Sequence, residues 1–154
     1  MKTSSHPEWK WLVLLSSLAV LPLSTFGQDQ PDEVRNGLLL TAGIPSLSIS
    51  YEHQLAHKKE NRRFYLRGIA GQFGDLINQE WTGYLAVMPA WVFGTGNNHL
   101  ETGVGLTLVS PSNSPEVWAA LNLGYRYKKP GEALIFRAGG GIPEGAYISF
   151  GLAF

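Results

Sequence analysis

Hydrophobic and polar residues alternate along most of the chain from about residue 34 onward. Between residues 100 and 108, one set of alternate positions holds Leu, Thr or Val, and the other set holds Glu, Gly or Thr. The same period of two returns in residues 47–55, 117–127 and 146–154. A period of two is typical of a β-strand with two different faces. One face of each segment is large and apolar, and the other is small or polar.

Residues rich in Gly, Pro, Asn or charge separate the alternating segments and indicate turns. They divide the chain into eight predicted strands: 34–43, 46–56, 62–72, 80–93, 99–109, 116–127, 132–141 and 146–154. Pro89 is unfavourable in the fourth predicted strand, because proline cannot donate a ladder hydrogen bond. The short links favour an antiparallel meander. Eight such strands predict an all-β, up-and-down barrel, since closure removes exposed sheet edges.

The size of the side chains predicts which face lines the barrel. The interior of an eight-stranded barrel is only just wide enough for side chains. The polar face is also the small face, and its members include Ser48, Ser50, Gly103, Gly105, Gly124, Gly139, Ser149 and Gly151. A barrel with large apolar residues outside and small polar residues inside is a transmembrane β-barrel. Aromatic residues near the predicted strand ends suit the membrane interfaces, although Trp118 and Tyr147 fall on the inward face.

The Lys, Arg, Asp and Glu residues in the interiors of the predicted strands fall on the inward face. They are two carboxylates and three guanidinium groups: Glu52, Arg67, Glu101, Arg126 and Arg137. We expect these charges to pair in the lumen, because an unpaired buried charge is costly. A lumen charge network could plug the barrel or could form a path for protons or ions. The plug is favoured, because so narrow an interior is normally packed.

The N-terminal segment has the three-part layout of a secretory signal peptide. Lys2 and Lys10 precede an apolar run at residues 11–23, which is too short to span a bilayer. Small residues follow and predict cleavage before Gln28, so residues 1–27 are the expected signal peptide and 28–154 the barrel domain. The chain has no cysteine, which excludes a disulfide or a lipid-anchored cysteine. Its formal net charge of zero argues against nucleic acid binding. We expect no cofactor and no metal.

The signal peptide, the eight alternating segments and the final "YISFGLAF" together resemble the small outer-membrane β-barrel proteins of Gram-negative bacteria. In that family an alternating apolar last strand with a final aromatic residue is an assembly signal. Here Ile148, Phe150, Leu152 and Phe154 match it. The resemblance implies export through the periplasm and integration into the outer membrane by the barrel assembly machinery. It implies contact with outer-membrane lipids, a monomer, and both termini in the periplasm. The predicted outer loops are short, which argues against a receptor or adhesin.

Two other functions were weighed against a non-catalytic structural or barrier role. Some barrels of this size modify lipid A by moving or removing an acyl chain, which requires a histidine base oriented by an acid. His53 is predicted outward beside the inward Glu52, His57 in a turn, and His99 on the face of Glu101 without a serine two residues later. The other alternative is a soluble periplasmic barrel that binds an apolar ligand, for which the bulky face would have to point inward.

Overall fold

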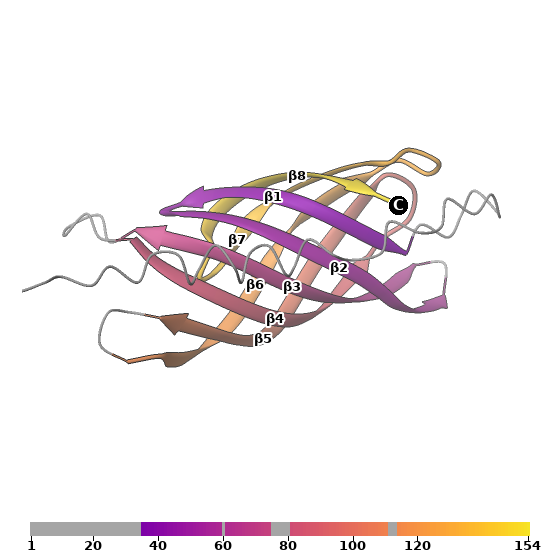
Figure 1. The fold of residues 1–154 in the computed structure, drawn as a ribbon. Coiled ribbons are helices and arrows are strands. Elements are labelled where there is room, and N and C mark those ends of the chain that lie inside the picture. The colour runs from indigo at the N-terminus through magenta and orange to yellow at the C-terminus, as the bar shows by residue number, and fades with distance from the viewer. Residues whose placement is uncertain (1–34, 60, 75–80, 111–113) are drawn as a thin grey trace, which may run out of the picture. The chain divides into compact units, whose positions relative to one another are not determined.

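A computed structural model of the chain describes residues 35–59, 61–74, 81–110 and 114–154. The predicted signal peptide, residues 1–27, lies outside the described residues. The described residues form a closed antiparallel barrel whose strands follow one another in chain order, with β1 next to β8 (Figure 1). The strands are β1 (Asn36–Ile44), β2 (Ser46–Lys59), β3 (Arg62–Gly74), β4 (Trp81–Phe93), β5 (Asn98–Ser110), β6 (Glu116–Lys128), β7 (Leu134–Ile142) and β8 (Gly145–Ala153). The predicted eight-stranded up-and-down barrel is confirmed.

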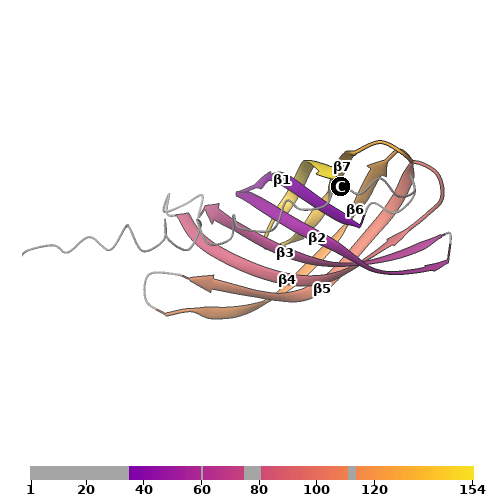
Figure 2. The same ribbon diagram turned by 45° about the vertical axis from the view of Figure 1, so that its right-hand side comes forward.

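The last strand closes the barrel against the first. Leu38 is opposite Leu152 and Leu40 is opposite Phe150 in the β1–β8 register. The backbone N–H and C=O groups of Asn36 exchange two hydrogen bonds of 3.0 Å with those of Phe154. The views in Figures 1 and 2 agree that tilted strands wrap around into a tube. The end of the barrel at which Asn36 and Phe154 pair is called the terminal end below.

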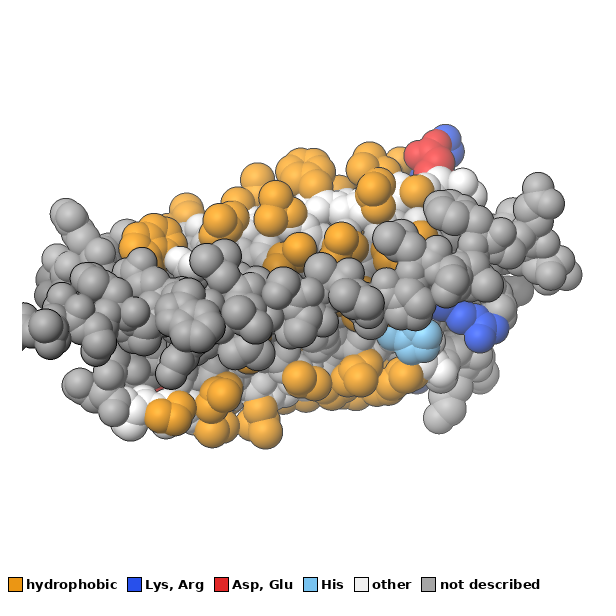
Figure 3. Space-filling view, viewed as in Figure 1, with side chains coloured by type: hydrophobic (Ala, Val, Ile, Leu, Met, Phe, Trp, Pro, Cys, Tyr) orange, Lys and Arg blue, Asp and Glu red, His pale blue; other side chains and the backbone are white. Residues whose placement is uncertain are grey.

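The two faces of each strand have the polarity that the alternation predicts. On β5, Glu101 and Thr107 are buried, whereas Val104 and Leu106 are exposed. Hydrophobic side chains accordingly lie along the visible barrel wall in Figure 3. The large apolar residues therefore point outward, which is opposite to the arrangement that a soluble barrel with an apolar ligand would need. The described residues contain no helix long and apolar enough to cross a membrane.

Strand β2 is longer than the sequence predicted. It runs to Lys59, so His57 lies on a strand and its prediction as a turn residue was wrong. Pairing with β3 continues past Gln54 through two register shifts, and His57 is opposite Arg63. Backbone pairing does not depend on side-chain polarity, so a charged segment can extend a ladder through bulges. The interpretation of residues 57–61 as a turn had used their polarity alone.

Pro89 lies inside β4 without breaking the barrel. It is opposite Leu66 of β3, where pairing is continuous. On the β5 side the register passes from Val87 to Ala90 without a partner for the residues between them. The missing N–H of proline thus falls where the β4–β5 ladder is interrupted, which explains how an internal strand tolerates it.

Apolar clusters occupy part of each half of the lumen. The half away from the terminal end holds one cluster: Ile69, Tyr84, Ala86, Met88, Val109 and Ala120, with Phe73 packed against it. The half near the terminal end holds two smaller clusters, one of Leu39, Ile135 and Ala153 and the other of Tyr65, Ala90 and Val92. The strand positions place the charged residues between these apolar groups. The lumen is therefore layered along its axis.

The two aromatic residues that the sequence placed inward have different surroundings. Tyr147 is 4% exposed and lies in the lumen. Trp118 is 40% exposed near the start of β6, where its ring lies 5.6 Å from that of Phe73 and its indole N–H donates to Glu116. Trp118 thus lies at the mouth of the barrel opposite the terminal end. The inward position of each follows from the strand period, and its depth follows from its place along the strand.

Candidate functional site

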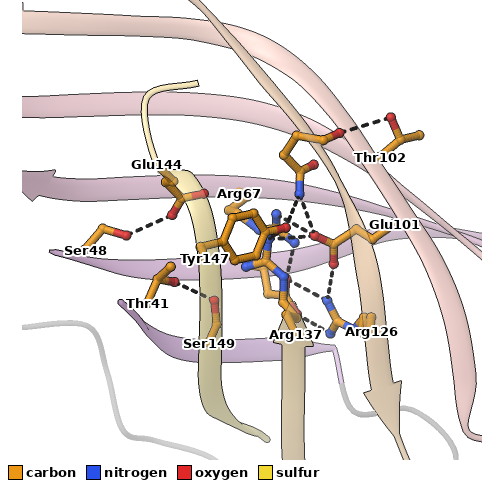
Figure 4. Close-up of polar contacts among 12 residues, drawn as sticks. Thr41, Ser48, Arg67, Glu101, Thr102, Arg126, Arg137, Glu144, Tyr147 and Ser149 are labelled. Atoms are coloured by element: carbon orange, nitrogen blue, oxygen red, sulfur yellow. Dashed lines mark hydrogen bonds and ion pairs between the residues drawn. The ribbon is translucent and has the colours of Figure 1, made fainter. Parts of the chain in front are cut away.

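A cluster of ion pairs occupies the middle of the lumen. The structure brings all five predicted lumen charges together, and each is at most 2% exposed. Glu52 comes from β2, Arg67 from β3, Glu101 from β5, Arg126 from β6 and Arg137 from β7. Figure 4 shows the guanidinium groups converging on Glu101. This group of five residues is called the charged layer.

Each carboxylate of the charged layer is shared by several guanidinium groups. Arg67 donates from Nη1 to Glu101 and from Nη2 to Glu52, both at 2.9 Å. Arg126 donates from Nη1 to Glu52 at 3.0 Å and to Glu101 at 3.2 Å, and a second contact joins its Nη2 to Glu52. Arg137 Nη2 lies 2.7 Å from Glu101 Oε1. Glu101 therefore contacts three cations, and Glu52 contacts two.

The register explains part of this arrangement. Glu52 lies opposite Arg67 on β2 and β3, so this pair is a cross-strand neighbour pair. Arg126 and Arg137 also lie opposite one another, on β6 and β7, which alone would be repulsive. Glu101 contacts both of these guanidinium groups and offsets their repulsion. The contact of Arg126 with Glu52 runs across the lumen, from β6 to β2, so the charged layer ties opposite walls of the barrel together.

Asn122 and Tyr147 donate to or accept from members of the charged layer, which their sequence positions did not predict. The Asn122 amide donates to Glu101 at 3.0 Å and to the Tyr147 hydroxyl at 2.8 Å. Arg137 donates to the same hydroxyl at 3.2 Å. Both residues occupy inward positions in the period-two pattern. That position was the available signal, but it does not give the depth or the partners of a side chain.

Two glycines make room for the Tyr147 side chain. A Cβ atom on Gly124 would lie 2.8 Å from the Tyr147 hydroxyl, and one on Gly139 would lie 2.9 Å from it. A Cβ on Gly139 would also lie 2.6 Å from the Gly124 Cα atom, which a side-chain rotation cannot relieve. Real Cβ atoms essentially never approach so closely. The small residues of the inward face are therefore what allows a large phenol to enter so narrow a lumen.

Glu144 is a buried carboxylate outside the charged layer. It lies between β7 and β8, yet it is 2% exposed. Ser48 donates to its carboxylate at 2.9 Å, and Ser46 donates to its backbone carbonyl at 2.7 Å. Thr41 and Ser149 share a further buried hydrogen bond of 2.7 Å. The sequence placed Glu144 in a turn, where a solvated side chain is the ordinary expectation, so its burial had no local signal.

The two histidines whose side chains the structure describes, His53 and His99, do not form the acid–base pair of an acyl-transfer enzyme. His53 is exposed, and its Nδ1 lies 2.8 Å from the Asn36 side-chain oxygen. His99 is buried on the face of Glu101, but the Glu101 carboxylate is engaged by three arginines. Thr102 points away from this face and donates to the Asn122 carbonyl. Among the described residues no group of three His, Cys, Asp or Glu side chains could hold a metal ion.

Comparisons with known proteins give one structural likeness. No protein-family model matches the chain, and no curated protein matches it either. Among solved structures, the chain is similar to the N-terminal β-barrel domain of OprF from Pseudomonas aeruginosa. The two have 14% sequence identity and a TM-score of 0.46, and the match covers 78% of this chain and 96% of that domain.

Proposed function

We propose that this chain is an integral β-barrel of the bacterial outer membrane with a structural or barrier role and no catalytic site. The observation that carries the proposal is the inverted distribution of polarity across the barrel wall. Leu106, Leu123 and Phe150 are 64%, 60% and 55% exposed on the outside, whereas the charged layer is buried. Water would not favour such a surface, and hydrocarbon would. A protein of this class is stable when lipid covers its outer face.

Aromatic residues support the same location. Trp91 packs on Phe64 toward the terminal end, with ring centroids 5.4 Å apart, and exposed Trp81 begins β4 at the opposite end. Amphipathic aromatic rings are enriched at both interfaces of a membrane. The strands between these rings are long enough for a tilted crossing, since a transmembrane strand needs about 9–11 residues. The outer-membrane lipids are thus the proposed partners of the whole barrel wall.

The layered lumen supports a barrier rather than a channel. The charged layer ties opposite walls together, and apolar clusters lie on both sides of it. An ion that entered would have to displace internal ion pairs and pass apolar side chains without its water shell. Both steps are costly in a low-dielectric interior. The lumen charges are therefore proposed to have a structural role.

Export and assembly form the remainder of the proposal. Residues 1–27 would direct the chain into the periplasm and be removed before Gln28. The barrel assembly machinery would read Ile148, Phe150, Leu152 and Phe154, three of which alternate on the outer face of β8. The terminal end would then face the periplasm. We expect a monomer, because the closed barrel leaves no strand edge unpaired.

Heat modifiability on SDS gels tests this proposal in membrane fractions of cells that make the chain. We expect the unboiled protein to migrate differently from the boiled protein and to remain with membranes in carbonate. Deletion of Phe154 should reduce the heat-modifiable fraction, whereas substitution of the outward Leu134 by Ile should leave it unchanged. A protein that washes free of membranes and shows no mobility shift would rule out the membrane location.

A further inference from the structure

Among the described residues, the Lys and Arg side chains outside the charged layer are confined to one end of the barrel, where Arg63 of β3 and Lys128 of β6 fall on inward positions and Arg62 falls on an outward one. After residue 27, every Lys and Arg that is not in the charged layer falls at position 35, in residues 58–63 or at positions 128–129. The antiparallel topology brings these three segments to the terminal end, because they lie at the start of β1, around the β2–β3 link and after β6. The described members form what we call the basic end: Arg35, Arg62, Arg63, Lys128 and Lys129.

The opposite end lacks such cations. Among the described residues it carries no Lys or Arg; its Glu116 is exposed and its Glu144 is buried. At the basic end, Glu132 is the described acidic side chain, and it accepts a hydrogen bond of 2.6 Å from Lys129. That bond raises the pKa of Lys129, so this amine is protonated at neutral pH. The Lys and Arg side chains visible in Figure 3 lie toward the end where the C-terminus lies in Figure 1.

The basic end coincides with lipid-facing aromatic rings. The Arg62 guanidinium lies 6.0 Å from the centre of the Phe93 ring, and Arg62 is opposite Phe93 in the β3–β4 register. Two pairs further along the same two strands, Phe64 packs against Trp91. Phe93 and Trp91 both lie on the outward face of β4. Aromatic rings of this kind mark the depth of lipid headgroups, so Arg62 lies at the level where phosphates would be found.

We propose that the basic end binds the phosphates of anionic phospholipids in the leaflet on its side of the membrane. This inference rests on the proposed membrane location. Guanidinium groups match phosphate geometry through paired N–H donors. Cations close to an anionic membrane surface attract its lipids, and the effect of one Lys or Arg corresponds to about a fivefold preference. The opposite end, with its acidic side chains, has no such preference. Lipid composition would therefore favour one orientation of the barrel.

Two tryptophans report on the two ends separately. Trp91 lies next to the basic end and Trp81 begins the same strand at the opposite end. Two variants of the full chain, each keeping one of these tryptophans with the other four replaced by Phe, can be reconstituted into phosphatidylcholine vesicles. In every preparation a fixed fraction of the lipid carries two bromine atoms near its headgroup. This brominated lipid is phosphatidylglycerol in one set of vesicles and phosphatidylcholine in the other. Bromine quenches tryptophan on contact, so the ratio of quenching by the two lipids measures local enrichment.

We expect Trp91 to be quenched up to about fivefold more strongly by brominated phosphatidylglycerol than by brominated phosphatidylcholine, and Trp81 equally by both. Arg62→Gln with Arg63→Gln should bring the Trp91 ratio close to that of Trp81. Arg62→Lys with Arg63→Lys is the matched control and should keep the ratio, because it keeps both charges. Added salt at about 1 M should also abolish the difference, since the Debye length then falls to about 3 Å.

Results that contradict the lipid preference differ from results that contradict the membrane location. Equal quenching of Trp91 by the two lipids would overturn the lipid preference and leave the membrane location intact. A preference that survives the glutamine variants would also overturn it, because the cations would then not be the cause. Failure of both lipids to quench either tryptophan would overturn the membrane location, and this inference with it. The salt dependence uses the unsubstituted arginines, so it gives a result even if the glutamine variants do not fold.

Discussion

Individual residues in the lumen carry the charges and the space on which the interior depends. Glu101 is the carboxylate that contacts Arg67, Arg126 and Arg137 together. Its neighbour Gly103 is small enough for the Met88 and Asn122 side chains to pack over it. Glu101 and Gly103 therefore have linked roles, because the Asn122 side chain that donates to the Glu101 carboxylate packs over the space that Gly103 leaves.

Substitution of Glu101 by Gln should be strongly destabilising. The change keeps the shape of the side chain but leaves three guanidinium groups with Glu52 as their remaining carboxylate in the charged layer. Removing one partner of a buried ion pair costs about 3–5 kcal/mol. Urea titration of the reconstituted barrel would measure the free energy of unfolding. Thr41→Val removes one neutral buried hydrogen bond and is the control, with an expected cost of about 1 kcal/mol. Equal losses for both variants would contradict a special role of charge.

Adjacent glycines on β7 should respond differently to the same substitution. Gly139→Ala places a Cβ atom 2.5 Å from the Leu123 carbonyl oxygen and against Tyr147, so overpacking should cost about 1–3 kcal/mol. Gly140→Ala points outward, where the nearest atom is 3.8 Å away, and should be neutral or slightly stabilising. The same unfolding titration checks both variants. A Gly140→Ala loss as large as that of Gly139→Ala would contradict the assigned faces.

At the scale of one element, strand β5 shows how the alternation of residues gives the two faces of the barrel wall different polarity. Its outward residues Leu100, Val104 and Leu106 are exposed, and its inward residues Glu101 and Thr107 are buried. Neither side resembles the surface of a water-soluble strand. In the proposed membrane location, lipid would cover one face of the strand and the lumen network would satisfy the other.

Arginine substitutions along β5 should show a dependence on depth. Val104 lies near the middle of the strand, where an arginine facing hydrocarbon should cost about 2–4 kcal/mol. Leu100 lies near the terminal end, where the same change should cost about 0–1 kcal/mol. The measurement is the difference in unfolding free energy between Val104→Arg and Leu100→Arg in lipid vesicles. Equal small costs at both positions would show that water, rather than lipid, surrounds the strand.

At the scale of the whole molecule, the barrel is a tube whose interior is filled in layers. Apolar clusters, the charged layer and a capping carboxylate at Glu144 follow one another along its axis. Among the described residues, the cations outside the charged layer also have an ordered distribution along that axis, because they lie at the terminal end. These two distributions are independent, because one is set by inward positions and the other by the strand ends and links.

Reconstituted vesicles should retain small ions. In the described lumen the charged layer ties opposite walls together, so a solute would have to displace internal ion pairs to pass from one end to the other. We expect no steady single-channel openings in planar bilayers and no release of an entrapped fluorescent dye. A sixteen-stranded porin, which has an aqueous channel, is the positive control. Regular openings of uniform size would contradict the proposed plug and favour an ion path.

The sequence alone predicted the eight strands, their antiparallel order and the face on which each lumen charge lies. These features follow from the pleat, because successive side chains point to opposite faces whatever the rest of the chain does. Turn residues then marked most of the strand boundaries. The end of β2 was predicted too early, because charge at positions 57–59 was interpreted as a turn although the backbone continued to pair.

The tertiary structure decided which residues meet inside the barrel. The contact of Arg126 with Glu52 joins residues 74 positions apart, and it depends on the stagger accumulated across all the strands between them. The burial of Glu144 and the place of Tyr147 between Asn122 and Arg137 depend on the same closure. Local alternation cannot specify these partners, because it gives a side chain's face but neither its depth nor its neighbour across the lumen.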